Sequence, residues 1–238
     1  DSASIGLGQF ANAMRRGVRM AYIVENNGVY GLTKGQFSAT ADRGSKSKKG
    51  VINSDSPVDL VGIALQLGAT YVARSFSGDK DQLVPLIKGA MTHGGAAFID
   101  VISPCVTFNN HSGSTKSYDY VRQHNEAVSR IDFMTPGQEI TAMYGPGETI
   151  EVPQHDGTLL SLRKLHADYD PTDRWAAMSY MQQHAARGEV VTGLLYLDTL
   201  ATDLHTSLNT CADPLNSLRE RQLCPGASAL DKINASLR

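Results

Sequence analysis

The chain lacks the patterns that mark secreted, metal-finger and membrane proteins. Its three cysteines, Cys105, Cys211 and Cys224, are odd in number and far apart. This argues against a disulfide framework and against zinc sites, which use close Cys-x-x-Cys pairs. No apolar run approaches the roughly 18 residues of a membrane span, and the start lacks the basic-then-apolar pattern of a signal peptide. We therefore expect a cytoplasmic protein.

An excess of charge of either sign is also absent. The 22 Lys and Arg residues and 24 Asp and Glu residues leave a formal net charge of −2, so no long-range field favours nucleic acid or an anionic membrane. Hydrophobic residues make up 41% of the 238 positions, which is enough for a sizeable core. The length fits one large domain, or a domain with an extension.

Helical and strand patterns alternate over the first hundred residues. Leu60, Ile63, Ala64 and Leu67 follow amphipathic helix spacing. The expected elements are a helix over 5–16, a buried strand over 18–24, a long loop over 26–57, a helix over 60–67, a strand over 70–75, a helix over 79–92 that Pro85 should shift or kink, and a strand over 97–102. Such alternation predicts an α/β fold with a mostly parallel sheet and helices on both faces.

The second half has a different pattern. Asp156-Gly157 predicts a hairpin turn within 149–162. Asp170-Pro171 should cap a helix that runs to about residue 187, with Asp173 in its first turn. A strand is expected over 190–197, and an irregular arm from 198 onward. We expect residues 1–130 to belong to one domain and residues 131–238 to form an extension with a hairpin, a helix, a strand and an arm.

Ligands of such sheets bind at the carboxyl ends of the strands, and both Asn26 and Cys105 lie just beyond a strand end. The segment that begins at Asn26-Asn27-Gly28 offers amide and carbonyl oxygens for Mg²⁺ and backbone N–H groups for phosphate. An ordinary turn is the alternative interpretation of Asn-Asn-Gly, and a buried structural cysteine is the alternative for Cys105. The residues alone leave both open.

A longer stretch resembles a known family. The sequence ENNGVYGLTKGQ, preceded by SASIGLGQFANAMRRGVRMAYIV, is similar to the thiamine-diphosphate motif of 2-oxoacid:ferredoxin oxidoreductase β subunits. The resemblance continues through LGATYVARS, FIDVISPCVTFNN, ADYDPTDR and the C-terminal arm. It covers essentially the whole chain and is closest to the 2-oxoglutarate type. It implies thiamine diphosphate and Mg²⁺ as cofactors and an α subunit as partner.

The resemblance also implies roles for single residues. Asn27 matches the side-chain metal ligand and Val29 the carbonyl ligand, and the diphosphate would lie over Gly31, Leu32 and Thr33. Asp1 matches the second Asp of the family's Gly-Asp-Gly-Asp motif. The first Asp, which is the chief metal carboxylate, and the first strands of the module would then precede this chain.

Cys105 matches one of four family cysteines that bind a [4Fe–4S] cluster. The other three would also lie upstream. Cys211 and Cys224 match no ligand position. Because only part of each site is present, we expect this chain alone to be inactive. The glutamate that activates the cofactor belongs to the family's α subunit, so no residue here is predicted to be catalytic.

The activity implied is the CoA-dependent oxidative decarboxylation of a 2-oxoacid to an acyl-CoA and CO₂, with reduction of ferredoxin. A basic cluster in the long loop is either solvated or a contact for CoA phosphates or ferredoxin; it comprises Arg43, Lys46, Lys48 and Lys49. Two alternatives remain. One is a non-redox thiamine enzyme of the acetolactate-synthase class, which lacks a cluster. The other is a catalytically silent fragment that serves only in assembly.

Overall fold

A computed structural model describes residues 1–237 apart from 46, 48–49, 104–139, 154–158 and 225. The chain divides into two compact units, residues 1–204 and residues 205–238. The first contains the sheet and the candidate site.

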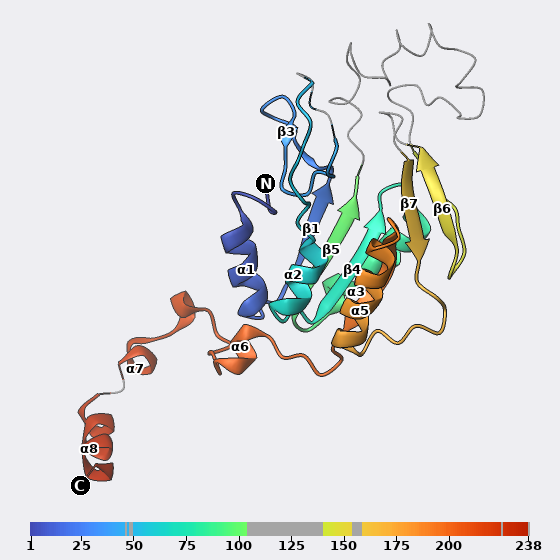
Figure 1. Ribbon diagram of the computed structural model, residues 1–238. Coiled ribbons are helices and arrows are strands. Elements are labelled where there is room, and N and C mark those ends of the chain that lie inside the picture. Colours follow the sequence, from blue (N-terminus) through green and yellow to red (C-terminus); the bar gives the residue numbers. More distant parts are fainter. Residues whose placement is uncertain (46, 48–49, 104–139, 154–158, 225, 238) are drawn as a thin grey trace, which may run out of the picture. The chain divides into compact units, whose positions relative to one another are not determined.

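The first unit is built on a mixed six-stranded sheet (Figure 1). Its strands are, in spatial order, β1 (Met20–Asn26), β5 (Ala96–Ile102), β4 (Tyr71–Phe76), β8 (Val190–Leu197), β7 (Leu159–Lys164) and β6 (Thr149–Pro153). The β1–β5, β5–β4 and β8–β7 pairs are parallel, whereas the β4–β8 and β7–β6 pairs are antiparallel. The mostly parallel sheet predicted from the sequence is confirmed.

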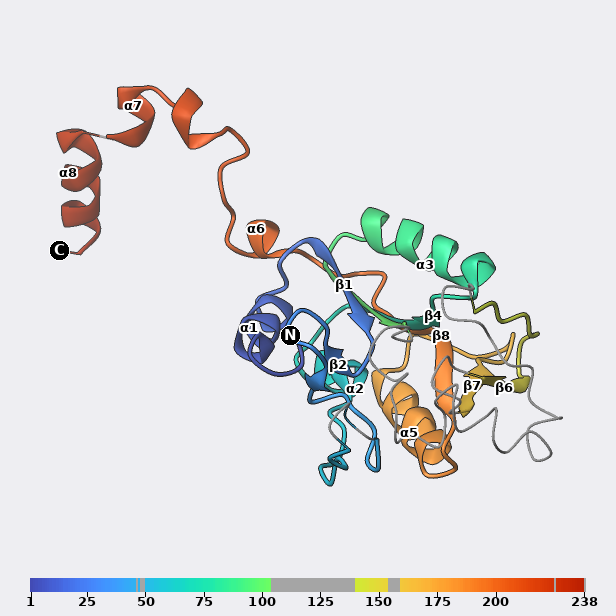
Figure 2. The same ribbon diagram turned by 90° about the horizontal axis from the view of Figure 1, so that it is seen from above.

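Helices cover both faces of this sheet, also as predicted (Figure 2). On one face lie α1 (Leu7–Arg15), α2 (Leu60–Gln66) and α5 (Arg174–Ala185), and on the other lies α3 (Lys80–Thr92). The parallel strands β1, β5 and β4 end in register at Asn26, Ile102 and Phe76. Their carboxyl ends therefore form one edge from which loops leave the sheet.

The larger core lies between the sheet and the helices α1, α2 and α5. Phe98 of β5 is fully buried and makes an edge-on contact with Phe10 of α1, with ring centroids 5.0 Å apart. Burying aromatic surface of this size is a main source of stability in such layers. The core fixes α1 and α2 on the strands that lead to the candidate site.

Two local expectations were wrong. The strand predicted over 18–24 is β1, which begins two residues later and is half-exposed, with Ile23 at 41% exposure. The reason is that β1 is an edge strand of the described sheet.

The predicted cap of α5 was also wrong. The helix is capped by Asp173, whose carboxylate accepts the N–H groups of Trp175 and Ala176, whereas Asp170 accepts the N–H of Thr172 in the preceding turn.

The remaining elements agree closely with expectation. Helix α3 begins after its cap Asp79 and continues through Pro85. Strands β6 and β7 form the predicted antiparallel hairpin, whose turn lies outside the described residues. Strand β8 has the predicted bounds of 190–197. The proposed boundary at 130 lies in a part of the chain that the structure does not describe, but β8, from beyond it, pairs with β4 in the central sheet.

The expectation of an irregular arm from residue 198 onward was wrong in part, because the second unit contains short helices. Following α6 (Leu204–Ser207), it contains a 3-10 turn (Leu215–Ser217), α7 (Glu220–Leu223) and the longer α8 (Ala227–Ser236). Among the described helices, none is long and apolar enough to cross a membrane.

Candidate functional site

A small hairpin leaves the carboxyl end of β1. Its strands β2 (Val29–Tyr30) and β3 (Gln36–Phe37) pair antiparallel, and Ser38 N–H closes the hairpin on the carbonyl of Gly28 at 2.9 Å. Gly28 has a φ of 70°, a conformation that side chains with a Cβ rarely adopt. The predicted motif is therefore a defined hairpin within the long loop.

Three predicted site residues meet at the base of this hairpin. Asp1, Asn27 and Val29 all line a small hollow of about 30 Å³. Asn27 Oδ1 accepts the N–H of Val29 at 3.1 Å, which holds the amide oxygen at the turn. Carboxylate, amide and carbonyl oxygens are the ligand types that Mg²⁺ prefers. The metal roles of Asn27 and Val29 and the cofactor-binding role of Asp1 stay predictions.

The other three predicted residues form the tip of the hairpin. Within the described part of the chain, the backbone N–H groups of Gly31, Leu32 and Thr33 donate to no other protein group. Leu32 is 99% exposed, and the Thr33 hydroxyl donates to Gln36 Oε1 at 2.6 Å. Consecutive free N–H groups form the kind of donor set that binds phosphate.

A cavity of about 430 Å³ adjoins the hairpin. It is lined by the end of β1, the loop that follows, the central strands, and apolar residues of α5, β7 and β8. Among the described residues, its charged lining consists of one guanidinium, Arg74, and four carboxylates, those of Asp42, Asp59, Asp100 and Glu189. This balance disfavours a free anion and favours a cationic or metal-neutralised ligand.

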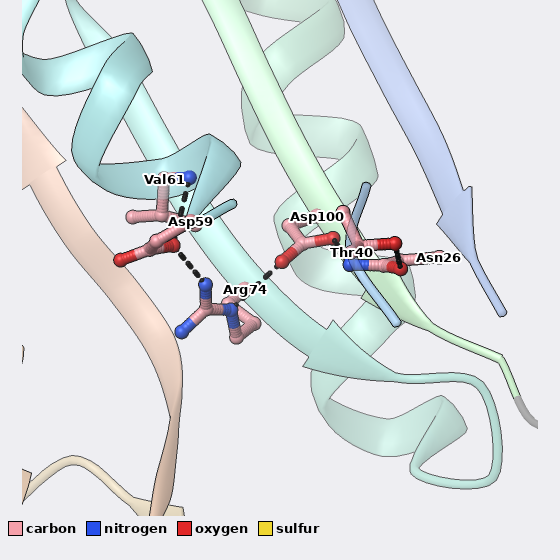
Figure 3. Close-up of polar contacts among 6 residues, drawn as sticks. All are labelled: Asn26, Thr40, Asp59, Val61, Arg74 and Asp100. Carbon is pink, nitrogen blue, oxygen red and sulfur yellow. Dashed lines mark hydrogen bonds and ion pairs between the residues drawn. The ribbon is translucent and has the colours of Figure 1, made fainter. Parts of the chain in front are cut away.

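A polar network of residues that line the cavity crosses the strands (Figure 3). Asn26 Nδ2 donates to Asp100 Oδ1 at 3.1 Å, Arg74 Nε donates to Asp100 Oδ2 at 2.9 Å, and Arg74 Nη2 contacts Asp59 Oδ1 at 2.5 Å. Burial alone would lower the pKa of Arg74, but the charges of Asp59 and Asp100 raise it above its ordinary value. The guanidinium therefore stays protonated.

Sequence analysis missed Asp59, Arg74 and Asp100. A signal was present, because Arg74 and Asp100 interrupt the apolar strands YVARSF and AAFIDVI, and charged residues are rarely buried unless they are paired. The pairing itself needed the strand order, which places the two residues opposite each other in the β4–β5 register.

The predicted cluster ligand Cys105 lies outside the described residues, as do Lys46, Lys48 and Lys49 of the basic cluster. Cys211 and Cys224 are both exposed. The described residues contain no group of three or more His, Cys, Asp or Glu side chains placed to hold a metal. A metal at the hairpin would thus depend on oxygens such as those of Asn27 and Val29 together with phosphate. The N–H groups at the tip, which are free within the described part of the chain, are donors of the kind that a diphosphate needs.

Comparison with known proteins finds similarity to thiamine-diphosphate enzymes over the first part of the chain. The family model described as thiamine pyrophosphate enzyme, C-terminal TPP binding domain, matches residues 1–101. The 2-oxoacid:ferredoxin oxidoreductase subunit beta of Saccharolobus solfataricus is 47% identical over 135 residues, which cover 56% of this chain and 41% of the relative. The 2-oxoglutarate oxidoreductase subunit KorB of Mycobacterium tuberculosis is 36% identical over 141 residues, which cover 59% of this chain and 36% of the relative.

One solved structure is similar over most of the chain. It is a 2-oxoglutarate:ferredoxin oxidoreductase from Magnetococcus marinus with 2-oxoglutarate, coenzyme A and succinyl-CoA bound. The TM-score is 0.59 at 28% identity, and the match covers 90% of this chain and 61% of the other. The chain spans less than half the length of the two curated relatives.

Residues 1–101, which include the hairpin, match the C-terminal domain of thiamine-diphosphate enzymes. The chain is similar to the β subunits of 2-oxoacid:ferredoxin oxidoreductases, as the resemblance indicated.

Proposed function

We propose that this chain acts as a β subunit of a 2-oxoacid:ferredoxin oxidoreductase of the 2-oxoglutarate type. The reaction joins the acyl group of the 2-oxoacid to CoA, releases CO₂, and passes two electrons to ferredoxin. The observation that carries the proposal is the hairpin after β1, which places Asn27 and Val29 around one hollow. The three consecutive N–H groups at its tip donate to no group of the described residues. The names of the relatives support the substrate class.

In this proposal the chain's residues bind and orient the cofactor. Asn27 Oδ1 and the Val29 carbonyl hold Mg²⁺, with Asp1 as a further oxygen donor, and the N–H groups of Gly31, Leu32 and Thr33 hold the diphosphate. Bound thiamine diphosphate supplies the carbon nucleophile and the electron sink for decarboxylation. The adjoining cavity offers the cofactor apolar side chains of α5, β7 and β8, and its acidic groups favour the cationic ring of the cofactor.

Electron transfer and assembly complete the proposal. Cys105 would be one ligand of a [4Fe–4S] cluster, and an α subunit would complete the active site and supply the acid–base group. Ferredoxin is the proposed electron acceptor. Iron and sulfide analysis of the purified complex tests the cluster: near-stoichiometric iron that is lost in Cys105→Ser supports it. A complex that is active with thiamine diphosphate but free of iron would instead identify the non-redox alternative.

Calorimetric titration tests cofactor binding directly. Thiamine diphosphate should bind the full chain only with Mg²⁺ present, and Asn27→Ala should weaken binding at least about tenfold because a metal oxygen is lost. Asn12→Ala is the matched control, since Asn12 is exposed on α1 away from the hairpin. Mg²⁺-independent binding, or equal affinity for the two variants, would contradict the proposed site. No binding at all by the wild-type chain would favour the silent assembly fragment.

A further inference from the structure

Asp100 is a carboxylate in an unusual place. It lies near the end of β5, is 1% exposed, and is surrounded by apolar residues of the strand. A buried charge is retained only where partners compensate for its lost hydration. Its partners therefore indicate what the residue does.

One carboxylate oxygen of Asp100 is used by Arg74. The pair is formed across neighbouring parallel strands, and the guanidinium is also bound by Asp59, whose carboxylate caps α2 through the N–H of Val61 (Figure 3). Two carboxylates on one guanidinium leave Arg74 poorly suited to bind an incoming anion. Arg74 instead anchors Asp100 to the start of α2.

The second oxygen of Asp100 accepts the Nδ2–H of Asn26. The amide is also fixed from the other side, because the Thr40 hydroxyl donates to Asn26 Oδ1 at 2.7 Å. A carboxylate can only accept, so the two contacts together allow one orientation of this amide. The Asn26 carbonyl, in turn, accepts the N–H of Ser103 at 2.9 Å.

These contacts distinguish the two neighbouring asparagines. All of Asn26, Asn27 and Val29 line the small hollow, but the side chain of Asn26 is held by two other strands or loops and its carbonyl by Ser103. Asn27 is exposed, and its side chain is bound only within the turn, by the N–H of Val29, among the described residues. We propose that Asp100 is a positioning residue for the candidate cofactor site: it locks Asn26 at the end of β1 and so sets the turn that presents Asn27 and Val29. The inference rests on the proposed function, in which these two residues hold the metal.

Asp100→Asn tests this with little change of shape. It turns an acceptor that faces two donors into an amide, so one of the two contacts is lost. Asp79→Asn is the matched control, since Asp79 is 4% exposed and bonds Lys164 Nζ at 2.6 Å, but caps α3 and does not line the cavity. Thr40→Val is a second variant that removes only a hydroxyl from the Asn26 amide.

Two measurements on the full chain separate positioning from general stability. In hydrogen exchange without cofactor, Asp100→Asn should raise the exchange rates of the Val29 and Ser38 amide hydrogens by about tenfold or more. In calorimetry, the same substitution should weaken Mg²⁺-dependent binding of thiamine diphosphate by about tenfold or more. Thr40→Val should also raise the exchange rates and weaken the binding, but less than Asp100→Asn does. Asp79→Asn should leave both within about twofold even where it lowers the melting temperature.

The inference is overturned if Asp100→Asn and Thr40→Val leave loop exchange and affinity unchanged, or if Asp79→Asn changes them equally. If the wild-type chain binds no thiamine diphosphate, the proposed function fails. In that case the exchange rates still decide whether Asp100 sets the turn.

Discussion

The carbonyl oxygen of Ile140 occupies the space in which a side chain on Gly78 would begin. Gly78 follows β4, and its own carbonyl accepts the N–H of Ala142 at 3.0 Å. Two segments about 60 residues apart in sequence thus pack backbone against backbone, an approach that only glycine permits.

Gly78→Ala should therefore destabilise the protein by about 2–3 kcal/mol, because a Cβ would force the two backbones apart. Urea denaturation measures the change. Gly8→Ala is the control: Gly8 is exposed in α1 with no atom within 4 Å of its added Cβ, so alanine should stabilise by about 0.5–1 kcal/mol. Equal and small effects at both positions would contradict the close packing.

Arg74→Met should cost on the order of 3 kcal/mol of stability, because it leaves the buried carboxylate of Asp100 without its cation. The same substitution at Arg187, which is exposed after α5, should change stability by less than about 0.5 kcal/mol. The comparison uses midpoints of denaturant unfolding. A tolerated Arg74→Met would mean that water or another donor compensates Asp100.

Phe98→Ala should destabilise by about 3–5 kcal/mol, since the ring is fully buried between the sheet and α1. A double-mutant cycle with Phe10→Ala should give a coupling free energy of about 1 kcal/mol, as expected for an edge-on aromatic pair. Strict additivity of the two substitutions would show that α1 does not rest on Phe98 through this contact.

Stability should also fall as the pH drops through the ordinary range of histidine. Burial lowers the pKa of His93 from 6.5, partly offset by Asp198, and its Nε2 lies 2.7 Å from the Thr70 hydroxyl. Below pH 6.5 the unfolded chain therefore takes up a proton that the folded chain resists. The slope of unfolding free energy against pH between 7 and 5 should be shallower in His93→Gln, and an unchanged slope would remove His93 as the cause.

The sequence was informative wherever a pattern is local. The helix that includes Leu60 and Leu65 and the strand that includes Phe98 follow from apolar periodicity. The site segment after Asn26 follows from a motif that is continuous in the chain, but only a loop was predicted there and not the hairpin. Asp173, and not Asp170, caps α5, because both aspartates satisfy the same local rule and only the completed turn selects between them.

The network at the site could not be predicted in the same way. Asn26, Arg74 and Asp100 lie on three strands that are separated by helices, and they meet only because the order β1-β5-β4 brings them together. Periodicity also fails in β8. A register shift opposite Val72 lets the consecutive side chains of Leu195 and Tyr196 join the same core.

The place of β8 in the sheet has a consequence for folding during synthesis. Strand β4 lies at the middle of the sheet, yet one of its two neighbours is β8, which begins more than a hundred residues later in the chain. Until residue 197 has left the ribosome, β4 remains an open edge that can pair with other chains. The stretch 1–101, which is the part that matches the family model, therefore lacks one neighbour of β4, and pairing over so long a separation slows folding.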